Sequence, residues 1–238
     1  VRLVATRASV RKLDKDRKVP IPTEALTTDS LAIVNDPEID LICELIGGVE
    51  EAKKLTLQAF ANGKSVVTAN KALICEHGNE LFEAAERAGV QYAFEASVAG
   101  GIPIIKVLRE SLVANEFPLI YGILNGTSNY ILTRMETEGA SFQEVLKDAR
   151  ELGYVEADES LDLDGIDAAH KAVILAYLAH GIWVDLKDIT VEGISKISNA
   201  DLDAAQKLGC KIKLICLIRM KIENDHVSFA VYPALLPM

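Results

Sequence analysis

The stretch of the sequence best equipped for chemistry runs from Gly153 to Lys171, where six carboxylates precede one lysine. Asp167 and Lys171 lie four residues apart in a run of helical apolar spacing, so a helix would place them side by side. A lysine withdrawn from water can exchange a proton with a carbonyl oxygen, and a carboxylate one turn away can orient it. The pair is therefore a candidate proton-transfer site. The six carboxylates are Glu156, Asp158, Glu159, Asp162, Asp164 and Asp167.

Two simpler interpretations apply to the same stretch. Carboxylates before a helix are favoured by the positive end of the helix dipole, and an exposed ion pair contributes only about 0.3–0.5 kcal/mol, so the stretch could be an acidic cap. A calcium loop is a poorer match. Aligning Gly165 with the invariant glycine of an EF-hand puts Ser160 and Lys171 at the first and last ligand positions, where carboxylates are required.

The first hundred residues alternate short apolar runs with helical stretches. This rhythm predicts a parallel sheet with helices on both faces, which binds ligands beyond the carboxyl ends of its strands. Gly47 and Lys71 fall at such ends. Arg7 follows the first predicted strand, where an arginine can meet a 2′-phosphate, although a solvated loop arginine explains it equally well. The predicted strands are 1–5, 40–48, 65–68 and 91–95, and the main helices are 49–62 and 71–88.

A doubly wound sheet normally opens with a glycine-rich strand-turn-helix, and no G-x-G-x-x-G motif occurs here. Without that turn the pyrophosphate site would be incomplete. We therefore expect the chain to be a fragment of a longer protein.

The pattern changes after Ile102 and predicts a mixed second domain. Thr127 or Ser128 is a candidate N-cap for one helix, and Ser141 with Glu144 forms a capping box for the next. The fold class is therefore α/β: a partial doubly wound, Rossmann-like domain over residues 1–101, followed by an α+β domain over residues 102–238. The second domain's predicted helices are 103–114, 128–138, 141–152, 166–180 and 200–208, and its strands are 119–124, 189–194, 211–222 and 226–232.

Composition excludes several classes of partner. The chain has 238 residues, a formal net charge of −10 and a half-hydrophobic composition, which argues against nucleic acid and suits a small-molecule ligand. No apolar run is long enough to span a membrane. The four cysteines show no C-x-x-C pairing, so we expect free thiols and a cytoplasmic location.

Four ordered motifs resemble the homoserine dehydrogenase family: Thr68–Leu73, Glu95–Pro103, Asn125–Tyr130 and Gly153–Lys171. The resemblance implies an NADP- or NAD-dependent enzyme that interconverts aspartate 4-semialdehyde and L-homoserine on the route to threonine and methionine. It also implies a homodimer formed through the second domain, which becomes a substrate and dimerisation domain.

The resemblance assigns roles residue by residue. Catalysis would involve Lys171, Lys71 and Asp167, and which lysine moves the proton stays open. The remaining carboxylates Glu159 and Asp164 match no role and are interpreted as solvated or capping. The substrate would contact Glu156, Asp162, Gly126, Thr127 and Tyr154, the cofactor would contact Arg7, Gly47 and Lys71, and the backbone carbonyls of Glu95, Val98, Gly100 and Ile102 would hold a structural monovalent cation, sodium.

Two other functions stay open. The missing glycine turn is compatible with a non-catalytic fragment of such an enzyme that binds substrate and dimerises. The chain could also belong to a related dehydrogenase that acts on a different semialdehyde or sugar.

Overall fold

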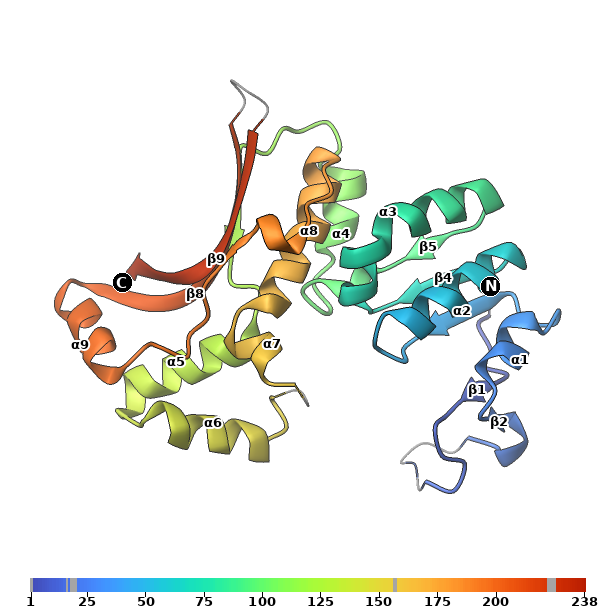
Figure 1. The fold of residues 1–238 in the computed structure, drawn as a ribbon, viewed down its shortest axis with the longest axis horizontal. Coiled ribbons are helices and arrows are strands. Elements are labelled where there is room, and N and C mark those ends of the chain that lie inside the picture. The colour runs from blue at the N-terminus through green and yellow to red at the C-terminus, as the bar shows by residue number, and fades with distance from the viewer. Residues whose placement is uncertain (1, 16, 18–20, 156–157, 222–225) are drawn as a thin grey trace. The chain divides into compact units, whose positions relative to one another are not determined.

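The computed structural model describes residues 2–15, 17, 21–155, 158–221 and 226–238. The chain forms two compact units, Val1–Ser97 and Val98–Met238 (Figure 1). The division of function at residue 101 stays a prediction. Within the described ranges, no helix has the length and apolarity needed to cross a membrane.

The first unit is built on a three-stranded parallel sheet of order β3-β4-β5. Helix α2 leads from β3 to β4 and helix α3 from β4 to β5, as the β-α-β rhythm predicted. Both predictions at the centre of this unit, strand 65–68 and helix 71–88, are confirmed. The elements are β3 Leu41–Glu44, α2 Glu50–Ala61, β4 Ser65–Thr68, α3 Lys71–Ala88 and β5 Tyr92–Ala93.

The helices of this unit correct one prediction, that both faces of the sheet are covered. Strands β3, β4 and β5 follow one another in chain order, so their right-handed crossovers put α2 and α3 on the same face, where the two helices pack together. Val67 is 37% exposed and its register partner Cys43 is also exposed. Glu44 and Thr68, the next pair in the register, are buried.

The predicted strand at residues 1–5 is wrong over its described part. Leu3 and Val4 are 80% and 63% exposed, and no described strand pairs with them. An apolar run is stabilised as a strand only when neighbours supply its ladder and cover it. The regular structure near this end is instead a short parallel pair, β1 Ala8–Ser9 with β2 Leu26–Thr27. The short helix η1 Thr23–Ala25 lies in the connection between the two strands, and α1 Ser30–Asn35 follows β2.

The second unit contains a four-stranded sheet of order β6-β8-β9-β7. The predicted antiparallel hairpin is confirmed, with Cys216 opposite Val231, and its second strand continues beyond Tyr232 to Pro237. Strand β6 extends the sheet antiparallel to β8, while β7 pairs parallel with β9. The strands are β6 Leu119–Gly122, β7 Thr190–Val191, β8 Cys210–Lys221 and β9 His226–Pro237.

The helices of the second unit follow the predicted positions, with differences at their ends. The capping box of Ser141 and Glu144 is confirmed. The predicted cap of α5 by Thr127 or Ser128 is wrong, because Asn125 accepts the Ser128 backbone N–H at 2.7 Å. The segments are α4 Ile104–Lys106, a π-turn η3 Val107–Ser111, α5 Gly126–Glu138, α6 Phe142–Glu151, α7 Ser160–Leu163, α8 Ile166–His180, η4 Leu186–Asp188 and α9 Asn199–Lys207.

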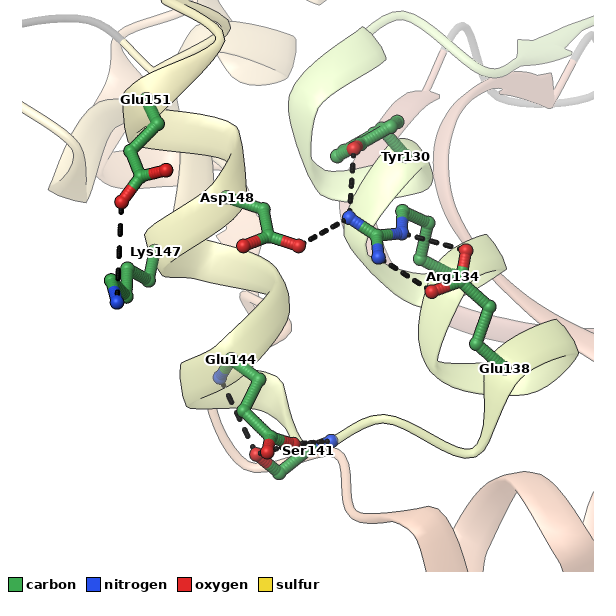
Figure 2. Close-up of polar contacts among 8 residues, drawn as sticks. All are labelled: Tyr130, Arg134, Glu138, Ser141, Glu144, Lys147, Asp148 and Glu151. Atoms are coloured by element: carbon green, nitrogen blue, oxygen red, sulfur yellow. Dashed lines mark hydrogen bonds and ion pairs between the residues drawn. The ribbon is translucent and has the colours of Figure 1, made fainter.

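Helices α5 and α6 are joined by one arginine (Figure 2). Arg134 donates to Asp148 at 2.8 Å across the helix pair and to Tyr130 at 3.2 Å. It also pairs with Glu138 on its own helix, and the pKa of Glu138 is lowered chiefly by this hydrogen bond. The arginine therefore adds a polar link between α6 and the helix that carries the Asn125–Tyr130 motif.

Candidate active site

The second unit brings three of the predicted site residues into one buried cluster. Lys171 donates to Asp167 at 2.6 Å, as the four-residue spacing predicted. Asp162, on the short helix α7, joins them through the amide of Asn125. Asp162 and Asp167 are each 4% exposed, and the Lys171 side chain is 16% exposed.

The turn between α7 and α8 places the two aspartates at neighbouring helix starts. Gly165 has a φ of 85°, and a Cβ there would lie 3.1 Å from Val231 and 3.2 Å from Val191. A Cβ on Gly193 would lie 2.1 Å from the Leu163 carbonyl oxygen. The turn is thus packed tightly on the β7 and β9 region, which fixes the carboxylates that it carries.

Lys171 is held from two sides. Its Nζ donates to the Leu124 carbonyl oxygen at 2.7 Å as well as to Asp167. An ammonium group has three N–H donors, and among the described residues no further acceptor takes the third. This arrangement can direct one proton of Lys171 toward a bound oxygen atom.

Asn125 joins the cluster, although the sequence analysis named it only as the first residue of a family motif and gave it no role. Its Nδ2 donates to Asp162 at 2.7 Å and to Asp167 at 2.8 Å, while its Oδ1 caps α5. Asn129 donates to the Asn125 carbonyl oxygen and exchanges two hydrogen bonds with the Leu214 backbone on β8. An asparagine three residues before Ser128 was a recognisable N-cap signal, but its contacts with the aspartates had no local signal.

The other predicted substrate residues lie at the start of α5 and in the following acidic loop. Gly126 is the first residue of α5, and Thr127 donates through its hydroxyl to the Tyr154 carbonyl oxygen at 2.8 Å. The Tyr154 ring packs edge-on against Tyr130 and stays 53% exposed. Glu156 lies outside the described residues, so its role stays a prediction.

Glu159 occupies the N-cap position of α7 and its side chain is 38% exposed, in keeping with the solvated or capping interpretation, and the structure adds an ion pair to it. It accepts two hydrogen bonds from Arg150, at 2.7 and 2.8 Å, and these bonds lower the pKa of Glu159. The bidentate pair fastens the segment before α7 to the end of α6.

In the first unit, Gly47 and Lys71 lie at the carboxyl ends of adjacent parallel strands. Gly47 and Gly48 have φ of 72° and 75°, and nothing lies within 4 Å of an added Cβ at either. This open turn suits the close approach of a nucleotide, and Lys71 begins the neighbouring helix. Arg7 precedes β1 and lies 3.8 Å from Asp36. The shared catalytic role of Lys71 and Lys171 stays a prediction, because the two belong to different units.

Of the predicted cation ligands, Glu95 belongs to the first unit and Val98, Gly100 and Ile102 to the second. Ala99 and Gly100 both have a φ of 58°, and Ala99 is the one non-glycine residue with positive φ in the described part of the chain. Val98 is buried, whereas Ile102 is 65% exposed. Glu95 begins the short helix η2 Glu95–Ser97. Across the described ranges, no group of three or more His, Cys, Asp or Glu side chains could hold a metal ion.

A parallel sheet with an open glycine turn is typical of a dinucleotide-binding domain, and the second unit adds a buried carboxylate–lysine cluster. Residues 103–238 match the family model described as homoserine dehydrogenase, and residues 1–95 match the model for the NAD-binding domain of homoserine dehydrogenase. The chain belongs to the homoserine dehydrogenase family.

Individual relatives agree with this assignment. Homoserine dehydrogenase from Synechocystis is 51% identical over 95% of this chain and 53% of its own length. The crystal structure of a homoserine dehydrogenase from Thiobacillus denitrificans is 49% identical, with a TM-score of 0.89, over 98% of this chain and 53% of that one. A hyperthermophilic archaeal homoserine dehydrogenase in complex with NADPH is 26% identical, with a TM-score of 0.71, over 88% of this chain and 59% of that one. The chain therefore spans about half the length of these relatives.

Proposed function

We propose that the protein containing this chain is an NAD(P)-dependent homoserine dehydrogenase that interconverts aspartate 4-semialdehyde and L-homoserine, a step toward threonine and methionine. The buried cluster of Asn125, Asp162, Asp167 and Lys171 carries the proposal, because a held lysine with a free-pointing N–H is what reduction of an aldehyde requires.

In the reductive direction, Lys171 gives a proton to the carbonyl oxygen. Asp167 and the Leu124 carbonyl oxygen accept two of its N–H groups, an arrangement that supports a role for the third as the donor to a substrate oxygen. Lys71 supplies a second cation that stabilises the negative charge growing on that oxygen. A bound reduced nicotinamide supplies the hydride.

Substrate recognition needs an acceptor for the ammonium group of homoserine. Asp162, with Glu156 from the acidic loop, is the proposed anionic partner. Gly126, Thr127 and Tyr154 line the same pocket in this proposal, supported by the Thr127 bond to the Tyr154 backbone.

The proposed cofactor site uses Gly47, Lys71 and Arg7, and NADPH is a suitable probe because the archaeal relative was solved with it. We also propose a structural sodium ion on the carbonyls of Glu95, Val98, Gly100 and Ile102, supported by the reversed backbone at Ala99 and Gly100. A thermal-shift assay tests that ion: replacing sodium with choline in the buffer should lower the Tm if sodium is bound.

A cytoplasmic homodimer completes the proposal. Leu119 and Tyr121 of β6 leave apolar surface 41% and 66% exposed on the second unit's sheet, which a second copy would cover. Analytical ultracentrifugation tests the dimer.

The activity is tested in the complete protein with Lys171→Ala and Lys71→Ala. Each is expected to lower the kcat for homoserine oxidation at least ~10²-fold, the usual contribution of acid–base catalysis. Lys187→Ala is the matched control, because that lysine is 75% exposed in a surface pair with Asp185. Near-normal turnover in both lysine variants, with folding checked by circular dichroism, would refute the proposal.

The alternative of a non-catalytic fragment predicts a different result for residues 1–238 alone. Thermal-shift titration would then show a response to homoserine but none to NADPH. A response to both ligands supports a chain that already carries both binding regions.

A further inference from the structure

Glu44 is a buried carboxylate that the proposed chemistry does not use. It lies at the carboxyl end of β3 and is 3% exposed. Its Oε1 accepts the Ile46 backbone N–H at 3.0 Å, and its Oε2 accepts the Thr68 hydroxyl at 2.6 Å. No lysine or arginine among the described residues pairs with it. Burying a carboxylate costs free energy, and a leucine at this position would avoid that cost. The two hydrogen bonds of Glu44 are therefore the feature that a leucine could not replace.

The bonds of Glu44 continue into a closed ring across two adjacent loops. Thr68 donates to Glu44 and accepts the Asn70 backbone N–H at 2.9 Å. Asn70 in turn donates through Nδ2 to the Gly48 carbonyl oxygen at 2.7 Å. The loop after β3 is therefore held at Ile46 by Glu44 and at Gly48 by Asn70.

The ring encloses a turn that would otherwise be loose. Gly47 and Gly48 both have left-handed φ and open space around them, so their conformational entropy when unrestrained is high. Asn70 also caps α3 by accepting the Leu73 N–H at 3.1 Å, which fixes the helix start where Lys71 lies. One network thus sets the spacing between the glycine turn and the lysine.

We infer that Glu44 is a positioning residue that holds the Gly47–Gly48 turn and the start of α3 in a preformed arrangement for the nicotinamide cofactor. Thr68 and Asn70 link Glu44 to Gly48 and to the start of α3 through their hydrogen bonds. The inference rests on the cofactor role of Gly47 and Lys71 in the proposed function, and it adds three residues to which no such role had been assigned.

Two substitutions in the complete protein test the ring. Glu44→Gln keeps the shape of the side chain and removes its charge: the amide oxygen can still accept the Ile46 N–H, but the NH₂ group must donate to the Thr68 hydroxyl, so the charge-assisted bond from Thr68 is replaced by a weaker neutral one. Thr68→Val removes the hydroxyl between Glu44 and Asn70. Thr68→Val is expected to raise the Kd for NADPH by roughly tenfold or more, the effect of losing one hydrogen bond to a charged group, and Glu44→Gln by a smaller factor of about threefold or more, because its bond is weakened and not lost. The KM for homoserine should change less than about twofold in both.

The chain offers matched controls for both changes. Thr56 is also buried, and its hydroxyl has no hydrogen-bond partner among the described residues, so Thr56→Val should leave the Kd for NADPH unchanged. Glu86→Gln makes the same charge change on the exposed side of α3. Thr68→Ser retains the hydroxyl and should restore NADPH binding, which a purely packing role of Thr68 would not produce.

The outcomes separate this inference from the proposed function. Wild-type Kd for NADPH in both Glu44→Gln and Thr68→Val, or an equal loss of NADPH and homoserine affinity, overturns the positioning role. If the unsubstituted protein binds NADPH but does not oxidise homoserine, the proposed function fails, and weaker NADPH binding by the two variants still supports the inference.

Discussion

Replacing Asn125 with aspartate is the sharpest test of how the buried cluster works. The Asn125 Oδ1 accepts a hydrogen bond at the start of α5, and its Nδ2 donates to both Asp162 and Asp167. The oxygen and the nitrogen of one amide group therefore have separate roles. Asn125→Asp keeps an oxygen for the cap and removes the bridging donor. Asn125→Ala removes both.

The magnitude follows from the bonds removed. Asn125 is 2% exposed, and each of its two hydrogen bonds to a carboxylate is worth about 1.5–3 kcal/mol. Losing both costs about 3–6 kcal/mol in Asn125→Asp, before the repulsion among three neighbouring carboxylates is added. Asn125→Ala loses about 1 kcal/mol more from the cap but introduces no charge.

The assay is steady-state oxidation of homoserine together with urea unfolding. If at least about 3 kcal/mol of the loss falls on the bound transition state, kcat/KM drops by about 10²-fold in Asn125→Asp. Asn115→Asp, an exposed residue, controls for the added charge. A kcat/KM for Asn125→Asp within about threefold of wild type would show that the bridge does not position the aspartates, and the reasoning would be refuted.

Three further predictions concern stability and reactivity. Arg134→Met, which breaks the link to Asp148, should lower the Tm, and high salt should narrow the difference from wild type. Burial lowers the pKa of His180 below its ordinary 6.5, so the unfolded state binds more protons and stability should fall as pH drops through 6.5. His180→Asn should flatten that slope in pH-dependent urea unfolding. Iodoacetamide should label exposed Cys43 in native residues 1–238 but not Cys216, whose buried thiol has a pKa raised to about 12; equal labelling would contradict this.

Local signals predicted much of the fold because they depend on neighbours in sequence. Alternation of apolar runs and helical stretches placed β4 and α3. The capping box at Ser141 and the Asp167–Lys171 pair are equally local, since a helix alone brings such residues together. The same logic failed at Leu3 and Val4, where the strand needed a neighbour that no local pattern supplies.

Contacts between distant segments were beyond these signals. Asn125 and Asp162 are 37 residues apart, and Asn129 meets Leu214 across 85 residues. Whether an asparagine caps a helix facing water or bridges buried carboxylates depends on what packs over it. Glu44 shows the same limit, since its position in an apolar run gave no sign of the Thr68 hydroxyl that donates a hydrogen bond to it.

Residue types and short spacings were thus enough to establish the family resemblance, the helix that pairs Asp167 with Lys171, and the strand ends that carry Gly47 and Lys71. Packing alone revealed that Asn125 ties two aspartates to one helix start and that Glu44 braces the glycine turn. The reason is that local patterns act through the backbone of one segment, whereas the burial of a polar side chain and the choice of its partner depend on segments that meet only after folding.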